Sequence, residues 1–183
     1  MKIFKFVAVA ILAFLISSCL TVEKKKYKFE FTGKNSGKLT ITYVNIFSQM
    51  DDSTDVSEQD FDELVNDYMN GTRIEDKYPM AANVTKKLYE ENGVLNGVVT
   101  MDFPNLDAVR LYQFNKKSPI CFNVGGTTDS ETFESSNGTL GNSEYMNVIF
   151  WGPKTKTLEV TTTVNEFDPA NCVSLISQFR RWK

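Results

Sequence analysis

The stretch YKFEFTGKNSGKLTITY, residues 27–43, predicts a β-hairpin. Apolar side chains alternate with polar ones on both sides of a central loop, at Tyr27, Phe29, Phe31, Leu39, Ile41 and Tyr43. A period of two is typical of strands that bury one face and expose the other to solvent. The loop, residues 33–37, begins and ends with glycine, and a short loop of this kind joins antiparallel strands.

The same loop partly matches a phosphate-binding motif at residues 33–38, GKNSGK. Three features disagree with that motif. The glycines are one residue too close, Leu39 stands where Ser or Thr should follow the lysine, and the loop joins two strands instead of opening a helix. We therefore interpret it as a hairpin loop.

Further strands are expected along the chain. Residues 83–90 and 94–103 form a second hairpin around Asn92-Gly93, the strongest two-residue hairpin signal. The second strand of this hairpin buries Leu95, Val99, Met101 and Phe103. In the second half of the chain, residues 120–124, 145–151 and 157–164 also predict strands, with Gly152-Pro153 as the turn between the last two.

Three segments predict helices. The first begins at Ser57, with Asp60 completing a variant capping box, and ends at Asn70-Gly71. Its apolar stripe consists of Phe61, Leu64, Val65, Tyr68 and Met69. A short helix is expected near 106–112, and a C-terminal helix begins at Asp168-Pro169 and ends near Trp182. Its stripe consists of Cys172, Leu175, Ile176 and Phe179.

These elements predict an α+β fold. The hairpins imply antiparallel pairing, and no strand is continuously apolar, as a buried parallel strand would be. We expect a single domain in which a twisted antiparallel sheet of hairpins carries two or three helices on one face.

The N-terminus has the features of a secretory signal. Lys2 and Lys5 precede an unbroken apolar run, residues 6–16, which is too short to span a bilayer. The end of this run and the residues after it, Leu15-Ile16-Ser17-Ser18-Cys19, resemble the lipobox of bacterial lipoproteins, with Ile16 where these signals more often carry leucine. The alternative is an uncleaved anchor with an incidental cysteine.

This resemblance implies a diacylglycerol on the Cys19 sulfur, cleavage between Ser18 and Cys19, and acylation of the new amino group, for example by palmitate. The expected organisation is a signal peptide at 1–18, a lipidated tether at 19–25 and one α+β domain at 26–183. In the tether, Lys24-Lys25-Lys26 either approach anionic headgroups or form a solvated linker.

The resemblance also implies a location. Leu20 follows the cysteine, where the enteric rule for retention in the inner membrane requires aspartate. We therefore expect an anchor in the outer membrane. Residues 23–26, Glu-Lys-Lys-Lys, are basic where tethers of surface-exported lipoproteins are often acidic, so we expect the domain to face the periplasm, with surface exposure as the alternative.

Composition excludes several kinds of chemistry. The chain of 183 residues contains no histidine, so an imidazole base, a Ser-His-Asp triad and a histidine-ligated metal are excluded. Three cysteines are too few for a four-thiolate zinc site. The net charge of −3 becomes −5 when residues 1–18, with two lysines and no acidic residue, are removed. An acidic chain argues against nucleic acid as a partner. We expect no metal and no cofactor.

The polar loop at residues 125–143 is the main candidate for ligand contact, because structureless loops of this length are uncommon and often functional. Asp129, Glu131, Phe133 and Glu134 are the candidate residues for a polar ligand or partner. Alternatively, residues 131–134 form one more edge strand.

Two other groups have structural alternatives that we favour. The acidic run Asp51-Asp52-Ser53-Thr54-Asp55 lacks the glycine and the frame of an EF-hand, and acids before a helix stabilise its positive end. Trp151 and Trp182 could stack on a sugar, but both lie on or beside apolar stripes and suit a core.

Cys121 and Cys172 remain once lipid occupies Cys19. Export to an oxidising compartment permits a disulfide between them, which would join the C-terminal helix to the strand at 120–124. The alternative is two separate buried thiols.

The sequence therefore predicts a lipoprotein of the cell envelope, attached to the membrane through Cys19. Its domain, which has no catalytic motif, binds an envelope protein or polar ligand or serves a structural role. The alternative is a carboxylate-dependent hydrolase acting on envelope polymers, which would need two acidic side chains to converge in one pocket.

Overall fold

The computed structural model describes residues 19–124, 131–141 and 147–183. Strands and bridges account for 48% of these residues and helices for 18%. The α+β prediction is therefore wrong, and the protein is mainly β. No helix in the described ranges is long and apolar enough to cross a membrane.

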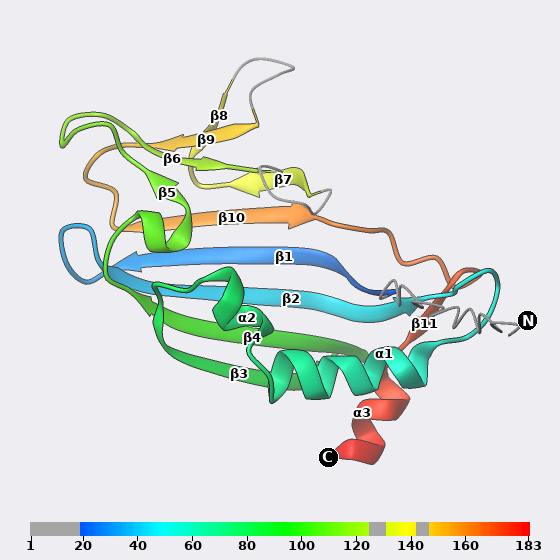
Figure 1. The fold of residues 1–183 in the computed structure, drawn as a ribbon. Coiled ribbons are helices and arrows are strands. Elements are labelled where there is room, and N and C mark those ends of the chain that lie inside the picture. The colour runs from blue at the N-terminus through cyan, green and yellow to red at the C-terminus, as the bar shows by residue number, and fades with distance from the viewer. Residues whose placement is uncertain (1–18, 125–130, 142–146) are drawn as a thin grey trace, which may run out of the picture.

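A large antiparallel sheet forms the body of the protein (Figure 1). Its strand order is β3 (Ala82–Glu91), β4 (Val94–Phe103), β2 (Gly37–Gln49), β1 (Leu20–Phe31), β10 (Thr157–Thr163) and β7 (Thr132–Ser136). The short strand β11 (Cys172–Ser174) pairs with the C-terminal end of β2. Both predicted hairpins are confirmed, because β1 pairs with β2 and β3 pairs with β4. At the β3–β4 turn, Asn92 and Gly93 both have positive φ, as a type I′ turn requires.

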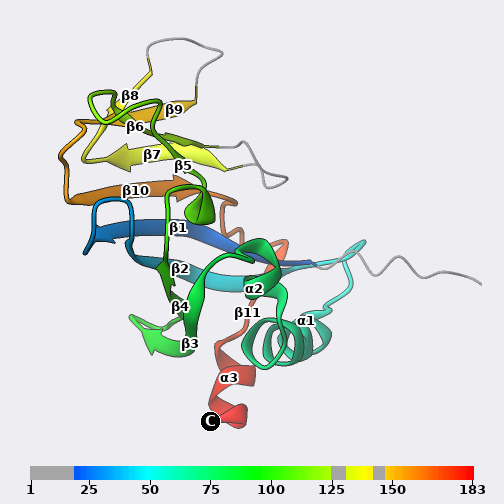
Figure 2. The same ribbon diagram turned by 60° about the vertical axis from the view of Figure 1, so that its left-hand side comes forward.

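A second sheet lies against the β10 and β7 end of the first (Figures 1 and 2). Its strand order is β5 (Leu111–Tyr112), β6 (Ile120–Asn123), β9 (Val148–Trp151) and β8 (Thr139–Leu140). Phe122 on β6 packs against Tyr27 and Phe29 of β1, with ring centroids 5.5 and 5.7 Å apart. The two sheets therefore share one hydrophobic core.

The single predicted sheet is wrong for a specific reason. Strands β9 and β10 follow one another through the turn at Gly152-Pro153, yet β9 pairs with β6 and β10 pairs with β1. Alternation of apolar and polar residues determines which side of a strand is buried, but it does not determine which strand becomes its neighbour.

The helices cover the other end of the same sheet face (Figure 2). Helix α1 (Ser57–Glu63) continues directly into the π-helix η1 (Leu64–Met69), and α2 (Arg73–Lys77) follows. The predicted helix from Ser57 to Asn70 is confirmed in position, but its capping box is wrong. The first turn has no side-chain cap, and the Ser57 hydroxyl accepts a hydrogen bond from Gln178 instead.

Two other helix predictions are too long. The segment at 106–112 contains only a 3₁₀ turn, η2 (Asp107–Val109), before β5 begins. At the C-terminus, Cys172 lies in β11, and the helix α3 (Ile176–Trp182) begins four residues later. Helix α3 packs its Phe179 into a second apolar cluster with Phe61 and Leu95.

The segment at 19–25, which we expected to be a tether, lies mainly in strand β1. Strand β1 begins at Leu20, which pairs with Ser48 of β2. Gln49 donates its backbone N–H to the carbonyl oxygen of Cys19 at 2.9 Å. The folded domain therefore starts one residue after the cysteine.

Candidate functional site

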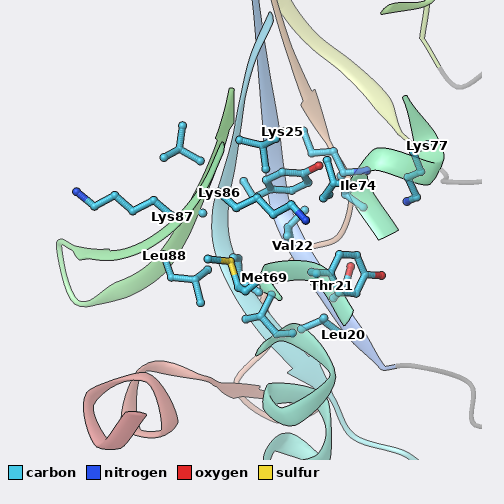
Figure 3. Close-up of a pocket in the computed structure, with 18 of the residues that line it drawn as sticks. Leu20, Thr21, Val22, Lys25, Met69, Ile74, Lys77, Lys86, Lys87 and Leu88 are labelled. Atoms are coloured by element: carbon cyan, nitrogen blue, oxygen red, sulfur yellow. The ribbon is translucent and has the colours of Figure 1, made fainter. Parts of the chain in front are cut away.

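A cavity of about 310 Å³ lies between the large sheet and the helical segments η1 and α2. Its apolar lining includes Val22, Ile46, Leu64, Met69, Ile74 and Leu88. Figure 3 shows Val22 of β1, Leu88 of β3, and Met69 and Ile74 of the helical segments around this space. The volume is at the lower end of the range for sites that bind small molecules.

The cavity exists partly because of Gly97, in the middle of β4. This glycine lines the cavity, opposite Tyr43 of β2 and Leu88 of β3 in the sheet. A Cβ atom here would lie 3.1 Å from Cδ1 of Ile46. A glycine inside a strand often marks a place where a ligand approaches closely.

The helical wall of the cavity has unusual geometry. The backbone N–H of Asn70 bonds to the carbonyl oxygen of Val65 at 2.9 Å, the five-residue spacing of a π-helix. Leu64, Tyr68 and Met69 of this segment all line the cavity. The π-helix is a rare conformation, and where it occurs it often lies at a functional site. The backbone geometry of this segment therefore also favours the cavity as a functional site.

The polar part of the lining is basic. It contains Lys25, Lys77, Lys86 and Lys87, and no acidic residue. Figure 3 shows Lys86 extending across the cavity and Lys87 pointing away from it. Lys77 forms no ion pair with any residue that the structure describes. The charged residues that line the cavity are therefore all basic, although Lys25 and Lys86 are paired with carboxylates outside the lining.

Lys86 is the central charged group of this site. Its side chain is only 9% exposed. The ammonium lies 2.7 Å from Oε2 of Glu75 and donates a hydrogen bond to the carbonyl oxygen of Gly71 at 2.7 Å. An ammonium carries three N–H donors, and no other described residue accepts one from Lys86. One donor therefore remains for a ligand oxygen.

Lys25 belongs to a polar network at the opposite side of the cavity. Its ammonium lies 2.8 Å from Oε1 of Glu131. Tyr27 and Thr162 also donate hydrogen bonds to this carboxylate, at 3.0 and 2.8 Å. Burial, followed by the charge of Glu131, raises the pKa of Tyr27 far above its usual range. The phenol therefore remains a donor over the ordinary pH range.

Three of the four predicted ligand residues, Glu131, Phe133 and Glu134, contact other parts of the protein. The alternative of an edge strand is correct, because β7 begins at Thr132 and pairs with β10. Glu131 binds Lys25, Glu134 binds Lys24 at 2.7 Å, and Phe133 packs on the hydrophobic core. Asp129 lies outside the described residues. These contacts give Glu131 and Glu134 a structural role and engage two of the three lysines expected in the tether.

The two tryptophans and the acidic run at residues 51–55, the other candidates from the sequence, make contacts within the protein. Trp151 is buried and donates to Asn137 at 2.7 Å, as expected for a core residue. Trp182 packs on Phe61 and Phe179 but is 48% exposed, so the core prediction is wrong for Trp182. Asp55 accepts the backbone N–H of Ser57 at 2.9 Å, next to the start of α1. Within the described ranges, no group of three acidic or cysteine side chains is arranged to hold a metal ion.

The structure contains no disulfide between Cys121 and Cys172, both of which it describes. Cys121 lies on β6 of the small sheet and Cys172 on β11 beside the end of β2. Figures 1 and 2 show these strands in different parts of the molecule. The predicted disulfide would have joined the C-terminal helix to the strand at 120–124, but Cys172 lies in strand β11 and not in helix α3.

Cys19 is half-buried at the edge of the helical end. Burial, together with the charges of Asp60 and Asp51, raises the pKa of its thiol. No sequence signal pointed to the cavity itself, because its lining comes from segments that are distant in the chain.

Comparison with known proteins gives no relative. No family model matches the chain, and neither a curated protein nor a solved structure is similar to it.

Proposed function

We propose that this protein is a lipid-anchored component of the bacterial cell envelope whose domain binds a small anionic amphiphile without catalysis. The anchor is the diacylglycerol on Cys19, and the preferred location is the periplasmic face of the outer membrane. The observation that carries the binding function is the cavity: apolar walls with the buried ammonium of Lys86 and the free charge of Lys77.

The chemistry of the cavity favours one class of ligand. Apolar walls bind a hydrocarbon chain through the hydrophobic effect. Charge-assisted hydrogen bonds from an ammonium favour a carboxylate or phosphate oxygen. A single-chain acyl anion, such as a fatty acid, combines both features. The cavity volume suits one chain and not a two-chain lipid.

The position of the cavity supports a membrane source for this ligand. Leu20 lines the cavity and directly follows the lipidation residue, so no tether separates the binding domain from the anchor. In a lipidated protein the cavity wall would therefore lie close to the bilayer surface. The ligand would be a product of membrane lipid or a molecule that partitions into the membrane.

Calorimetric titration of the chain from residue 20 onward with dodecanoate tests this function. Every described strand and helix lies within that chain. Dodecyltrimethylammonium and dodecanol, which have the same alkyl chain, are the matched cationic and neutral probes. We expect dodecanoate to bind most tightly. Equal binding of the cation would contradict an anion site, and absence of binding by all three would contradict the cavity as a ligand site.

The double variant Lys86→Met with Glu75→Gln refines the test, because it removes both charges of the ion pair. Dodecanoate affinity should fall about tenfold, the value of one charge-assisted hydrogen bond, while dodecanol binding should be nearly unchanged. Lys28→Met is the control, because Lys28 is an exposed lysine outside the cavity whose described partner is Glu30.

The hydrolase alternative has no observation in its favour. The lining of the cavity contains no carboxylate, so this cavity does not bring two acidic side chains together.

A further inference from the structure

Asp60 is a buried carboxylate beside Cys19. The residue is only 3% exposed. Ser48 donates its hydroxyl to Oδ2 of Asp60 at 2.6 Å, and the backbone N–H of Cys19 donates to the same carboxylate. No lysine or arginine of the described residues forms an ion pair with Asp60. Burial raises the pKa of Asp60, and the described residues supply no countercharge that would offset this effect.

The sheet holds the nitrogen of Cys19 in this position. The carbonyl oxygen of Cys19 accepts the backbone N–H of Gln49 at 2.9 Å, and Leu20 pairs with Ser48. Ser48 is also the residue that binds Asp60. The contact between Cys19 and Asp60 is therefore a consequence of the β1–β2 register.

Cleavage after Ser18 would change the chemistry of that nitrogen. Hydrolysis breaks the amide bond between Ser18 and Cys19, adds the hydroxyl of water to the Ser18 carbonyl carbon and leaves an amine on Cys19. At neutral pH this amine binds a further proton and becomes an ammonium group, because its ordinary pKa is about 7.7–8.0. The new cation would lie beside Asp60.

We propose that Asp60 is the binding site for the α-ammonium group of the mature chain, so that processing completes a buried ion pair between Cys19 and Asp60. This inference rests on the cleavage that the proposed function requires. The inference also goes beyond the proposed function. An ammonium group that is bound to Asp60 is not available for acylation, so we expect the nitrogen of Cys19 to carry no acyl chain.

The surrounding charges favour an ammonium group. Asp51 lies near Cys19, and Glu63 lies near Asp60 on the same helix. Glu63 is paired with Arg73 at 3.0 Å, and the exposed pair of Glu58 and Arg181 lies between α1 and α3. The amine therefore faces mainly carboxylates, which raise the pKa of a neighbouring amine.

The test compares two forms of the chain from residue 19 onward, with Cys19→Ser to remove the thiol. One form carries a free amine, released from an N-terminal fusion, and the other is acetylated. We expect the pKa of the free amine, measured by NMR, to be raised by about one to two units. The free-amine form should have the higher denaturation midpoint at pH 7, and this advantage should disappear as the pH rises through the raised pKa.

Asp60→Asn preserves the shape of the side chain and removes its charge. In this variant the amine pKa should return to its ordinary value, and the two forms should unfold together. Asp51→Asn is the matched control, because this exposed acid should account for only a small part of the shift. If Asp60→Asn does not fold, the comparison of free and acetylated forms of the parent chain decides. An ordinary amine pKa with equal midpoints in that comparison would overturn the inference.

The intact mass of the protein purified from membranes gives an independent readout. A mature chain with a diacylglycerol alone supports the ion pair. A third acyl chain on the nitrogen overturns it while leaving the lipoprotein function in place. A chain that retains residues 1–18 overturns both.

Discussion

The ammonium of Lys25 lies 2.8 Å from the carboxylate of Glu131, and the two residues are 106 positions apart in the chain. Their side chains are only 12% and 8% exposed. The ion pair connects β1 to the segment before β7, across the intervening strand β10. The pair therefore links Lys25, which also lines the cavity, to the β7 edge of the sheet.

Replacement of Glu131 by glutamine should destabilise the protein strongly. The substitution removes the buried carboxylate that binds Lys25 and accepts hydrogen bonds from Tyr27 and Thr162, and breaking such a buried ion pair costs about 3 kcal/mol or more. The free energy of unfolding in urea measures the effect. Glu134→Gln is the matched control, since its pair with Lys24 is largely exposed, and its cost should be below about 1 kcal/mol. Equal losses in the two variants would contradict a special role for Glu131.

Tyr27 should make stability fall at alkaline pH. Its pKa is raised in the folded state, mainly by burial, so the folded protein keeps a proton that the unfolded chain releases near pH 10. The contribution is fully present below pH 10 and decreases above it. Unfolding measured between pH 8 and 11 should show a steeper loss in the parent than in Tyr27→Phe. Parallel curves would disprove this assignment.

Gly97→Leu should fill the cavity from its floor. The backbone of Gly97 has no positive φ, so a side chain is allowed, and the nearest atom to its Cβ is the movable end of Ile46. We expect the protein to fold, with dodecanoate affinity reduced at least about tenfold. Gly152→Leu is the control, since a Cβ there meets only Thr155 at 3.5 Å. Circular dichroism checks folding, and unchanged affinity in the folded Gly97→Leu variant would rule out this cavity.

Cys19→Ala should prevent lipid attachment. The variant should run as an unprocessed precursor or appear in the soluble fraction, as judged by metabolic labelling with palmitate and by fractionation. A variant that is processed and membrane-bound like the parent would show that the lipobox interpretation is wrong. In that case residues 6–16 would anchor the chain by themselves.

The chain from residue 20 onward should contain two titratable thiols in denaturant without reductant. Cys121 and Cys172 are on different sheets and do not form a disulfide in the structure. A thiol reagent added to protein exported to an oxidising compartment provides the count. Zero thiols, with a mass two hydrogens lower, would show that the two cysteines pair after all.

Much of the local structure could be predicted from sequence. The alternation around residues 27–43, and the Asn92-Gly93 turn, depend on neighbouring residues only, and both hairpins form as expected. The helix stripe from Phe61 to Met69 is likewise a local signal. Its final turns are π-helical, which a period near 3.6 does not reveal.

The candidate site could not be predicted in the same way. In the sequence, Lys25 is part of the expected tether and Lys86 is a polar residue of a predicted strand. No pattern among their neighbours in the chain indicates that both side chains line one cavity. Glu131 appeared as a free acid in a polar loop, but its partners Lys25, Tyr27 and Thr162 come from two other strands. Asp60 appeared as part of a capping box, whereas it binds Ser48.

The sequence by itself determined the faces of the strands, the turns and the absence of histidine chemistry, because these depend on residue type and on spacing over a few positions. Only the tertiary structure decided that the strands divide into two sheets, that β1 begins at Leu20, and that a basic cavity lies beneath the helices. The physical reason is that strand pairing and burial of charge minimise free energy over contacts between distant segments. A lysine placed opposite Glu75 or Glu131 is stabilised by a partner that its own neighbours in the chain do not specify.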